Sequence, residues 1–254
     1  MTGGHREAYL DLVRRAVTNY LYLGGEASRE EFRCAAHYDI DAGNWKIDRL
    51  ALPATLLTAA QLDLVERSVL EVERRDVPGD LLEAGVWRGG VIVLMRALLS
   101  AHDIADRKVV AADSFAGIPR NTRATGDPVD AWPDRWVASR AEVEGILERF
   151  GLLDERIQFL EGYFEDSFRT LTGERYALIR LDSDSYDSVE TSLEYLYPRV
   201  SRGGIVIIDD WHLPGCRLAV ETYRAQLGIV DPIEEVEGNA WWTKSGEYGW
   251  PLPP

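Results

Sequence analysis

The short apolar run Leu178-Ile179-Arg180-Leu181 leads directly into Asp182-Ser183-Asp184. A second run, Gly204-Ile205-Val206-Ile207-Ile208, leads into Asp209-Asp210. Between them, residues 185–202 are enough for one helix and two turns. A strand, a helix and a strand of this length form a right-handed parallel crossover, so both acidic ends are expected at the same edge of one sheet.

These acidic strand ends indicate a cation site. Several carboxylates converge there, and like charges so close together need a cation or a proton. We therefore interpret them as metal ligands. Strand-end aspartates also cap the helices that follow them, and that alternative stays open.

Size and composition indicate a globular protein that binds neither nucleic acid nor membranes. The chain has 254 residues, of which 46% are hydrophobic, enough for one large domain or a domain with an extension. Its net charge of −15 disfavours contact with phosphate backbones or anionic lipid. The start of the chain does not resemble a signal peptide, and no apolar run is long enough to span a membrane. With only Cys34 and Cys216, far apart, we expect a cytoplasmic protein.

The chain divides into a helical first part and an alternating second part. Residues 1–76 are expected to form a lid or oligomerisation segment, which suggests a homo-oligomer, and residues 77–254 a catalytic domain. Helices are expected over residues 8–23, 30–36, 53–75, 91–102, 138–150 and 218–227. Strands are expected over residues 81–84, 109–112, 157–160, 178–181 and 204–208, with a hairpin of 233–236 and 240–243 around Gly238-Asn239.

This element order predicts a doubly wound α/β sheet of five parallel strands that ends in an antiparallel hairpin. Ligands of such sheets bind at the carboxyl ends of the strands. The segment 114–133 is long for a compact domain, and loops of that length are usually functional or mobile.

The turn after the first strand indicates the cofactor. Its sequence, Glu83-Ala84-Gly85-Val86-Trp87-Arg88-Gly89-Gly90, is neither a dinucleotide fingerprint nor a P-loop. Glu83 would repel a pyrophosphate but suits an ammonium group, and Asp113 at the end of the next strand can accept both hydroxyls of a ribose. Together they favour S-adenosylmethionine. Taken singly, the glycines are explained by tight packing and Asp113 by helix capping.

The same residues resemble a known family. Five segments are similar to the macrocin and mycinamicin O-methyltransferases. They are residues 82–90, Ala112-Asp113-Ser114-Phe115-Ala116-Gly117-Ile118-Pro119, residues 181–186, Tyr197-Pro198-Arg199 and residues 203–210. The resemblance spans about residues 9–242 and implies the class I methyltransferase fold. It also implies an S-adenosylmethionine- and Mg²⁺-dependent enzyme that methylates sugar hydroxyls of bacterial natural products.

On this basis we assign roles at the predicted site. Asp182, Asp209 and Asp210 are the expected Mg²⁺ ligands. The resemblance implies that Asp184 is the general base, and His212 in the neighbouring loop is a weaker alternative. The residues expected to bind the cofactor are Glu83, Gly85, Arg88, Asp113, Ser114, Gly162, Tyr163, Phe164 and Asp182. Trp45, Tyr186 and Trp211 are expected to line the acceptor pocket.

Two other functions stay open at this point. The same metal chemistry would serve an O-methyltransferase of a catechol or phenolic diol. A non-catalytic protein that binds a nucleotide-sugar or an adenosyl group is disfavoured, because binding alone needs no candidate base. The sequence does not identify the sugar, nor whether the acceptor is a nucleotide-sugar or a finished glycoside.

Overall fold

The structure, a computed structural model, describes residues 3–23, 38–39, 44–45, 53–119, 122 and 136–246. Its centre is a seven-stranded sheet of order β5-β4-β3-β6-β7-β9-β8. Neighbouring strands from β5 to β7 pair in parallel, whereas β9 runs antiparallel to both β7 and β8. The strands are β3 (Asp80–Ala84), β4 (Val109–Asp113), β5 (Ile157–Glu161), β6 (Tyr176–Leu181), β7 (Val200–Ile208), β8 (Glu234–Val236) and β9 (Asn239–Thr243). The predicted parallel sheet with its terminal hairpin is confirmed.

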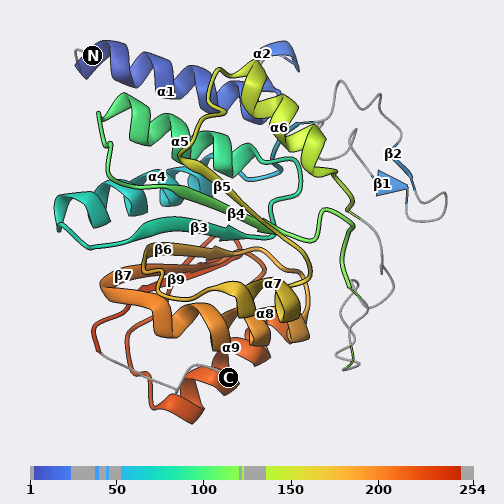
Figure 1. The fold of residues 1–254 in the computed structure, drawn as a ribbon, viewed down its shortest axis with the longest axis vertical. Coiled ribbons are helices and arrows are strands. Elements are labelled where there is room, and N and C mark those ends of the chain that lie inside the picture. Colours follow the sequence, from blue (N-terminus) through green and yellow to red (C-terminus); the bar gives the residue numbers. More distant parts are fainter. Residues whose placement is uncertain are drawn as a thin grey trace.

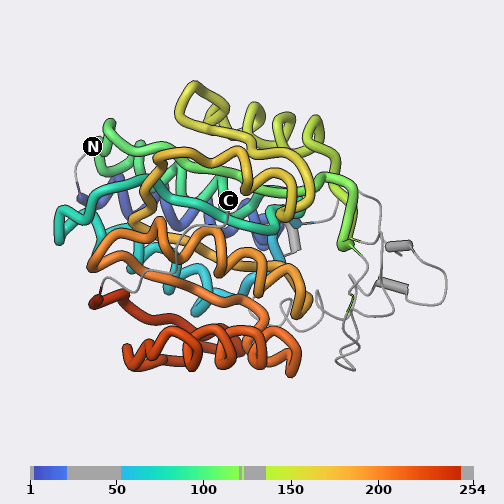
Figure 2. Tube along the Cα trace, turned by 60° about the horizontal axis from the view of Figure 1, so that its bottom comes forward, coloured from blue at the N-terminus to red at the C-terminus, as the bar shows by residue number. Residues whose placement is uncertain are grey.

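Helices cover both faces of this sheet (Figure 1). One face carries α1 (Gly3–Val17), α4 (Ala59–Arg74), α5 (Gly90–Ala101) and α6 (Arg140–Arg149). The other carries α7 (Phe164–Ser167), α8 (Tyr186–Leu196) and α9 (Pro214–Leu227). Figure 2 shows α6 and α9 on opposite sides of the strands. Short elements complete the fold: α2 (Tyr20–Leu23), the pair β1 (Tyr38–Asp39) and β2 (Asn44–Trp45), and the 3-10 turns η3 (Phe168–Thr170) and η4 (Tyr197–Arg199).

Alternation along the strands produces two cores. Leu81 belongs to the core under α1, α4, α5 and α6, whereas its neighbour Leu82 belongs to the core under α8 and α9. Successive strand residues point to opposite faces, so strands that are buried on both sides are apolar throughout. Leu10, Val13 and Val17 of α1 share the first of these cores, and α1 packs against α5. The division of the chain at residue 76 stays a prediction.

Helix α4 begins later than its predicted range. We expected it to begin at Pro53, but it begins at Ala59. Thr58 Oγ1 accepts a hydrogen bond from the backbone of Gln61, and Gln61 Oε1 accepts one from the backbone of Thr58. This capping box fixes the start of the helix and leaves residues 53–58 non-helical.

Other predicted elements agree within a few residues or cannot be compared. The predicted helix over 8–23 is divided into α1 and α2, with Asn19 in the left-handed region at φ 59°. The predicted helix over 30–36 and most of the segment 114–133 lie outside the described residues. Within the described part of the chain, no helix is both long and apolar enough to cross a membrane.

Candidate active site

A cavity of about 650 Å³ opens at the carboxyl ends of the parallel strands. Most of the predicted site residues border it, as expected for this kind of sheet. Those that line the cavity are Glu83, Gly85, Asp113, Ser114, Tyr163, Phe164, Asp182, Asp184, Asp209, Asp210 and His212.

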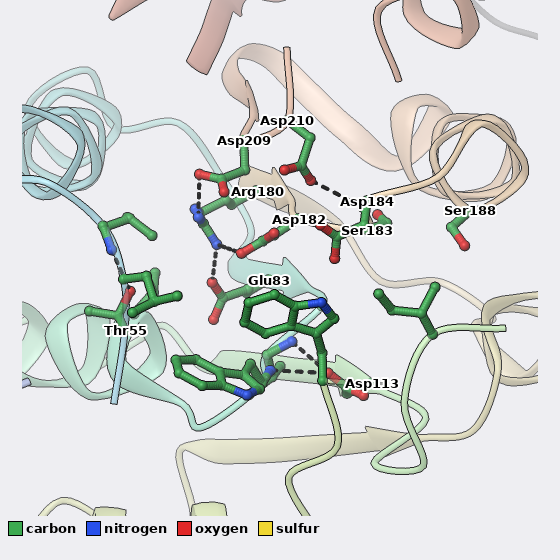
Figure 3. A pocket seen from close by; sticks show the side chains of 18 of the residues that line it. Thr55, Glu83, Asp113, Arg180, Asp182, Ser183, Asp184, Ser188, Asp209 and Asp210 are labelled. Carbon is green, nitrogen blue, oxygen red and sulfur yellow. Dashed lines mark hydrogen bonds and ion pairs between the residues drawn. The ribbon is translucent and has the colours of Figure 1, made fainter. Parts of the chain in front are cut away.

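The glycine turn after β3 is held in place by Asp113. One carboxylate oxygen of Asp113 accepts hydrogen bonds from the backbone N–H groups of Val86 (2.6 Å) and Trp87 (3.2 Å) (Figure 3). Gly85 has φ 89°, and a Cβ added to it would lie 1.5 Å from the backbone oxygen of Asp182. The turn and the acidic strand end are therefore in direct backbone contact, which only a glycine permits.

Arg180 lies at the centre of the acidic cluster (Figure 3). Its Nη1 donates to Glu83 and, over 2.9 Å, to Asp182, while its Nη2 donates to Asp209. The Arg180 side chain is fully buried. A single guanidinium thus donates hydrogen bonds to three carboxyl groups. We did not predict this role, although an arginine inside an apolar strand is a signal that buried acids must lie beside it.

Asp209 is held from a second side. Its Oδ1, which pairs with Arg180, also accepts a hydrogen bond of 2.9 Å from Asn239 Nδ2. Asn239 is the first residue of β9 and is fully buried. The carboxylate of Asp209 is therefore turned toward protein donors through one of its oxygens.

Three other carboxylate side chains converge beside it. Oxygen atoms of Asp182, Asp184 and Asp210 all lie within 4.8 Å of one another. Asp184 has φ 57°, in the left-handed region, and its backbone N–H donates to Asp210 Oδ2 over 3.0 Å. A non-glycine residue in this conformation is strained, and such strain concentrates at functional sites.

Crowding disfavours the charged forms of these acids. Burial, followed by the Asp209 charge, raises the pKa of Asp184 to about 7. Burial and neighbouring carboxylates likewise raise the pKa values of Asp182 and Asp210 well above the usual range. Three oxygen donors that repel one another suit a hard divalent cation such as Mg²⁺, which would stabilise their ionised forms.

Glu83 offers an unused acceptor at the other side of the cavity. Its Oε1 pairs with Arg180, but its Oε2 is buried and has no hydrogen-bond partner among the described residues. Burial outweighs the attraction of Arg180 and raises the pKa of Glu83 to about 8. A buried acceptor that borders a cavity fits a ligand with an ammonium group, because such a ligand supplies both the charge and the missing donor.

Some predicted residues lie elsewhere. Arg88 pairs with Glu142 of α6 at 3.1 Å and does not border the cavity. Tyr186 and Trp211 are buried, donate to Glu190 and Glu235, and are not among the described lining residues. Gly162 does not line the cavity either. Trp45 lies in β2, but its side chain is outside the described part of the chain. These assignments stay predictions.

Several lining residues were not predicted. Trp87 and Trp136 form an edge-to-face pair with ring centroids 5.9 Å apart. The segment before α4, the first turn of α4 and the β8–β9 turn supply further lining residues, namely Thr55, Leu56, Leu57, Gln61, Glu237 and Gly238. The hairpin was predictable from Gly238-Asn239, but its part in the cavity depends on packing between segments far apart in the sequence.

Comparison with known sequences places these features in context. Residues 6–244 match the family model described as Macrocin-O-methyltransferase (TylF). The chain is 39% identical over 94% of its length to 8-demethyl-8-(2,3-dimethoxy-alpha-L-rhamnosyl)-tetracenomycin-C 4'-O-methyltransferase of Streptomyces olivaceus, covering 92% of that protein. It is 38% identical over 94% of its length to mycinamicin III 3''-O-methyltransferase of Micromonospora griseorubida, covering 97% of it.

Solved structures agree with the fold. The O-methyltransferase NovP superposes with a TM-score of 0.82 at 35% identity, over 95% of this chain and all of that one. The calicheamicin methyltransferase CalS11 superposes with a TM-score of 0.61 at 20% identity, over 96% of this chain and 94% of that one. The sheet is thus the class I methyltransferase sheet, as predicted.

Proposed function

This chain belongs to the macrocin O-methyltransferase (TylF) family, and we propose that it methylates a hydroxyl group of a deoxysugar, either nucleotide-linked or part of a glycosylated natural product. It is an O-methyltransferase, and S-adenosylmethionine is the methyl donor of this fold. Two relatives are named as methyltransferases of a rhamnosylated tetracenomycin and of a mycinamicin, which supports a sugar of an antibiotic as acceptor. The observation that carries the proposal is the convergence of Asp182, Asp184 and Asp210 beside the cavity.

The methyl donor is proposed to bind between the glycine turn and the strand ends. Gly85 lets the turn lie directly against the backbone of Asp182, and Glu83 Oε2 would accept a hydrogen bond from the ligand's ammonium group. Asp113 lies at the end of β4, where an acid can reach ribose hydroxyls, and Tyr163 and Phe164 border the same cavity. The Asp113 oxygens already accept backbone hydrogen bonds, which fixes the side chain before the ligand arrives.

A divalent cation is proposed to bind at the acidic strand ends. Asp182, Asp209 and Asp210 are the proposed ligands, although the oxygens that converge are those of Asp182, Asp184 and Asp210, with Asp209 beside them. Asp209 would contribute through Oδ2, because its Oδ1 accepts from Arg180 and Asn239. When bound, the cation supplies Lewis acidity that makes a weakly acidic sugar hydroxyl easier to deprotonate.

Asp184 is proposed to remove the proton of the acceptor hydroxyl. Asp184 lines the cavity beside Asp182 and Asp210, and a cation bound there would hold its carboxyl group in the ionised form that can accept a proton. As the new bond forms between the acceptor oxygen and the methyl carbon, the bond between that carbon and sulfur breaks, and the hydroxyl proton passes to Asp184. His212 is exposed at the cavity and stays the weaker alternative.

A methylation screen tests this function. The protein would be incubated with labelled S-adenosylmethionine and a panel of rhamnosylated natural products, nucleotide-linked deoxysugars and catechols. We expect label in a sugar acceptor, loss of transfer with EDTA, and recovery with added Mg²⁺. Methyl transfer to catechols alone would refute a sugar acceptor. Methyl transfer at an unchanged rate in the presence of EDTA would refute the metal site.

Self-association is a separate proposal. The helical part before the sheet is proposed to act as a lid or oligomerisation segment of a cytoplasmic homo-oligomer. Leu12, at 52% exposure on α1, gives that helix an apolar residue on its outer surface. Light scattering coupled to size-exclusion chromatography measures the mass directly, and a mass near the 28.6 kDa of one chain would refute oligomerisation.

A further inference from the structure

A continuous chain of hydrogen bonds joins the start of α4 to the acidic cluster. Gln61 Nε2 donates to Asn239 Oδ1 over 2.7 Å. Asn239 Nδ2 donates to Asp209 Oδ1 over 2.9 Å, and Arg180 donates to that same oxygen. Gln61 and Asn239 have exposed fractions of only 8% and 0%. Side chains of α4, β9, β6 and the residue that follows β7 are thus linked, and the two amide side chains are shielded from bulk water.

The direction of the hydrogen bonds in this series is determined by the backbone N–H of Thr58. The backbone N–H of Thr58 can only donate, so it requires the oxygen of the Gln61 amide, which accepts over 2.8 Å. The Gln61 nitrogen must then face Asn239 and the backbone oxygen of Glu237, to which it donates over 2.9 Å. Asn239 consequently presents its oxygen to Gln61 and its nitrogen to Asp209. The helix cap therefore determines which amide atom meets the carboxylate.

Gln61, Arg180 and Asp209 of this series border the cavity. Gln61 lines it, as do Thr55 and Leu57 just before the helix and Glu237 and Gly238 just before Asn239. Any displacement of the helix start or of the hairpin turn relative to the sheet would disturb the hydrogen bond to Asp209. The position of this cavity wall is thus tied to the orientation of one carboxylate.

We propose that Asn239 and Gln61 are positioning residues for methyl transfer: Asn239 orients the Asp209 carboxylate and Gln61 orients Asn239. This inference rests on the proposed role of Asp209 in the reaction. By occupying Oδ1 together with Arg180, Asn239 leaves Oδ2 of Asp209 directed at the site. Removing such a supporting partner typically lowers metal affinity or activity about 10–100-fold.

Two variants separate positioning from packing. Asn239→Ala removes the donor to Asp209. Gln61→Glu keeps an acceptor for Thr58, and so keeps the capping box, but has no donor for Asn239. An acceptor at that place would turn the Asn239 amide around and withdraw its nitrogen from Asp209. Ser245→Ala is the control, since Ser245 hydrogen-bonds Asp231 beyond the opposite end of β9.

The test measures kcat and KM, Mg²⁺ affinity by calorimetry without acceptor, and the thermal midpoint of each variant. We expect Asn239→Ala and Gln61→Glu each to lower kcat or Mg²⁺ affinity about 10–100-fold, with S-adenosylmethionine affinity within about threefold of wild type. In the double variant, Gln61→Glu should add little to Asn239→Ala, because it acts through Asn239. Ser245→Ala should change only the thermal midpoint.

Two results would overturn the inference. One is retention of wild-type kcat and Mg²⁺ affinity in both single variants, with only the thermal midpoint lowered. The other is full additivity in the double variant. If wild-type protein neither binds Mg²⁺ nor responds to EDTA, the proposed metal site fails by itself, and kcat together with the double variant then decides on the positioning role.

Discussion

Arg180 and Glu83 are register partners on the neighbouring strands β6 and β3, and their side chains form an ion pair that is almost completely buried. Because the two residues face the same side of the sheet, Asp182 and Asp209 near the ends of β6 and β7 also reach the guanidinium. The proposed methyl-donor site and the proposed cation site therefore share one arginine. Its positive charge lies between acidic groups that would otherwise repel one another.

Replacing Arg180 should be strongly destabilising. Arg180→Met leaves three carboxylates without their cation, and breaking a buried ion pair in this way costs about 3–5 kcal/mol. Arg96→Met is a matched control, because Arg96 is also buried but its acidic partner among the described residues is Asp154, which is 29% exposed and can be hydrated. Urea unfolding at pH 8 measures the free energy of unfolding of both variants. Equal losses in the two variants would contradict a special role for Arg180.

The affinity for S-adenosylmethionine should depend on pH through Glu83. The pKa of Glu83 is raised to about 8, mainly by burial, so in the free protein the carboxyl group is increasingly protonated below pH 8. An ammonium group binds the ionised form, and the ligand must therefore displace a proton at lower pH. Because the ligand's own α-amino group loses its proton near pH 8, affinity should rise roughly tenfold from pH 6 to a maximum near pH 8 and fall again at higher pH.

Calorimetry in buffers of different ionisation enthalpy counts the protons released on binding. Glu83→Gln is the control, since it cannot titrate, while the ligand's own titration is common to both proteins. Its affinity should be lower and its pH dependence flatter than that of wild type. Equal pH profiles for the two proteins would show that Glu83 does not hold the ammonium group.

The division between ligands and base can be tested residue by residue. Asp184→Asn should retain Mg²⁺ and S-adenosylmethionine binding but lose about 10²–10⁴-fold in turnover. Asp182→Asn and Asp210→Asn should instead weaken Mg²⁺ binding. Because Asp184 oxygens lie within 4.8 Å of those of Asp182 and Asp210, the reverse pattern is a real alternative. If Asp184→Asn loses Mg²⁺ affinity while Asp209→Asn retains it, Asp184 is the third ligand. His212 then becomes the leading candidate for the general base.

Local sequence patterns predicted the sheet and the place of the site, because they determine where each strand ends. The acids at 182–184 and 209–210 could be assigned to one edge from the length of the crossover between them. The hydrogen-bond partners of those acids could not be predicted from the sequence. Arg180 was visible as a charge in an apolar strand, but which carboxylates it meets depends on the pairing of β3, β6 and β7.

Side-chain contacts were harder to predict than positions. Tyr186 is predicted to line the acceptor pocket; in the structure it is buried and its hydroxyl donates to Glu190 one helical turn later, a contact that we did not predict. Gln61 shows the converse case. Thr58-Ala59-Ala60-Gln61 has the spacing of a capping box, but nothing local indicates that its free amide nitrogen reaches Asn239. Contacts between residues so far apart in sequence arise only from tertiary packing.

The backbone of the glycine turn touches the backbone of the acidic strand end at Gly85. Gly85→Ala should abolish both S-adenosylmethionine binding and turnover. The new Cβ would lie 1.5 Å from the backbone oxygen of Asp182, and the φ of 89° is itself unfavourable for alanine by about 1–3 kcal/mol. The clash can be relieved only by moving either the turn or Asp182, and both belong to the proposed site. Gly173→Ala is the control, because a Cβ there meets nothing within 4 Å. We expect its unfolding free energy and activity to stay near wild type, and binding retained by Gly85→Ala would show that the turn and Asp182 do not need this close approach.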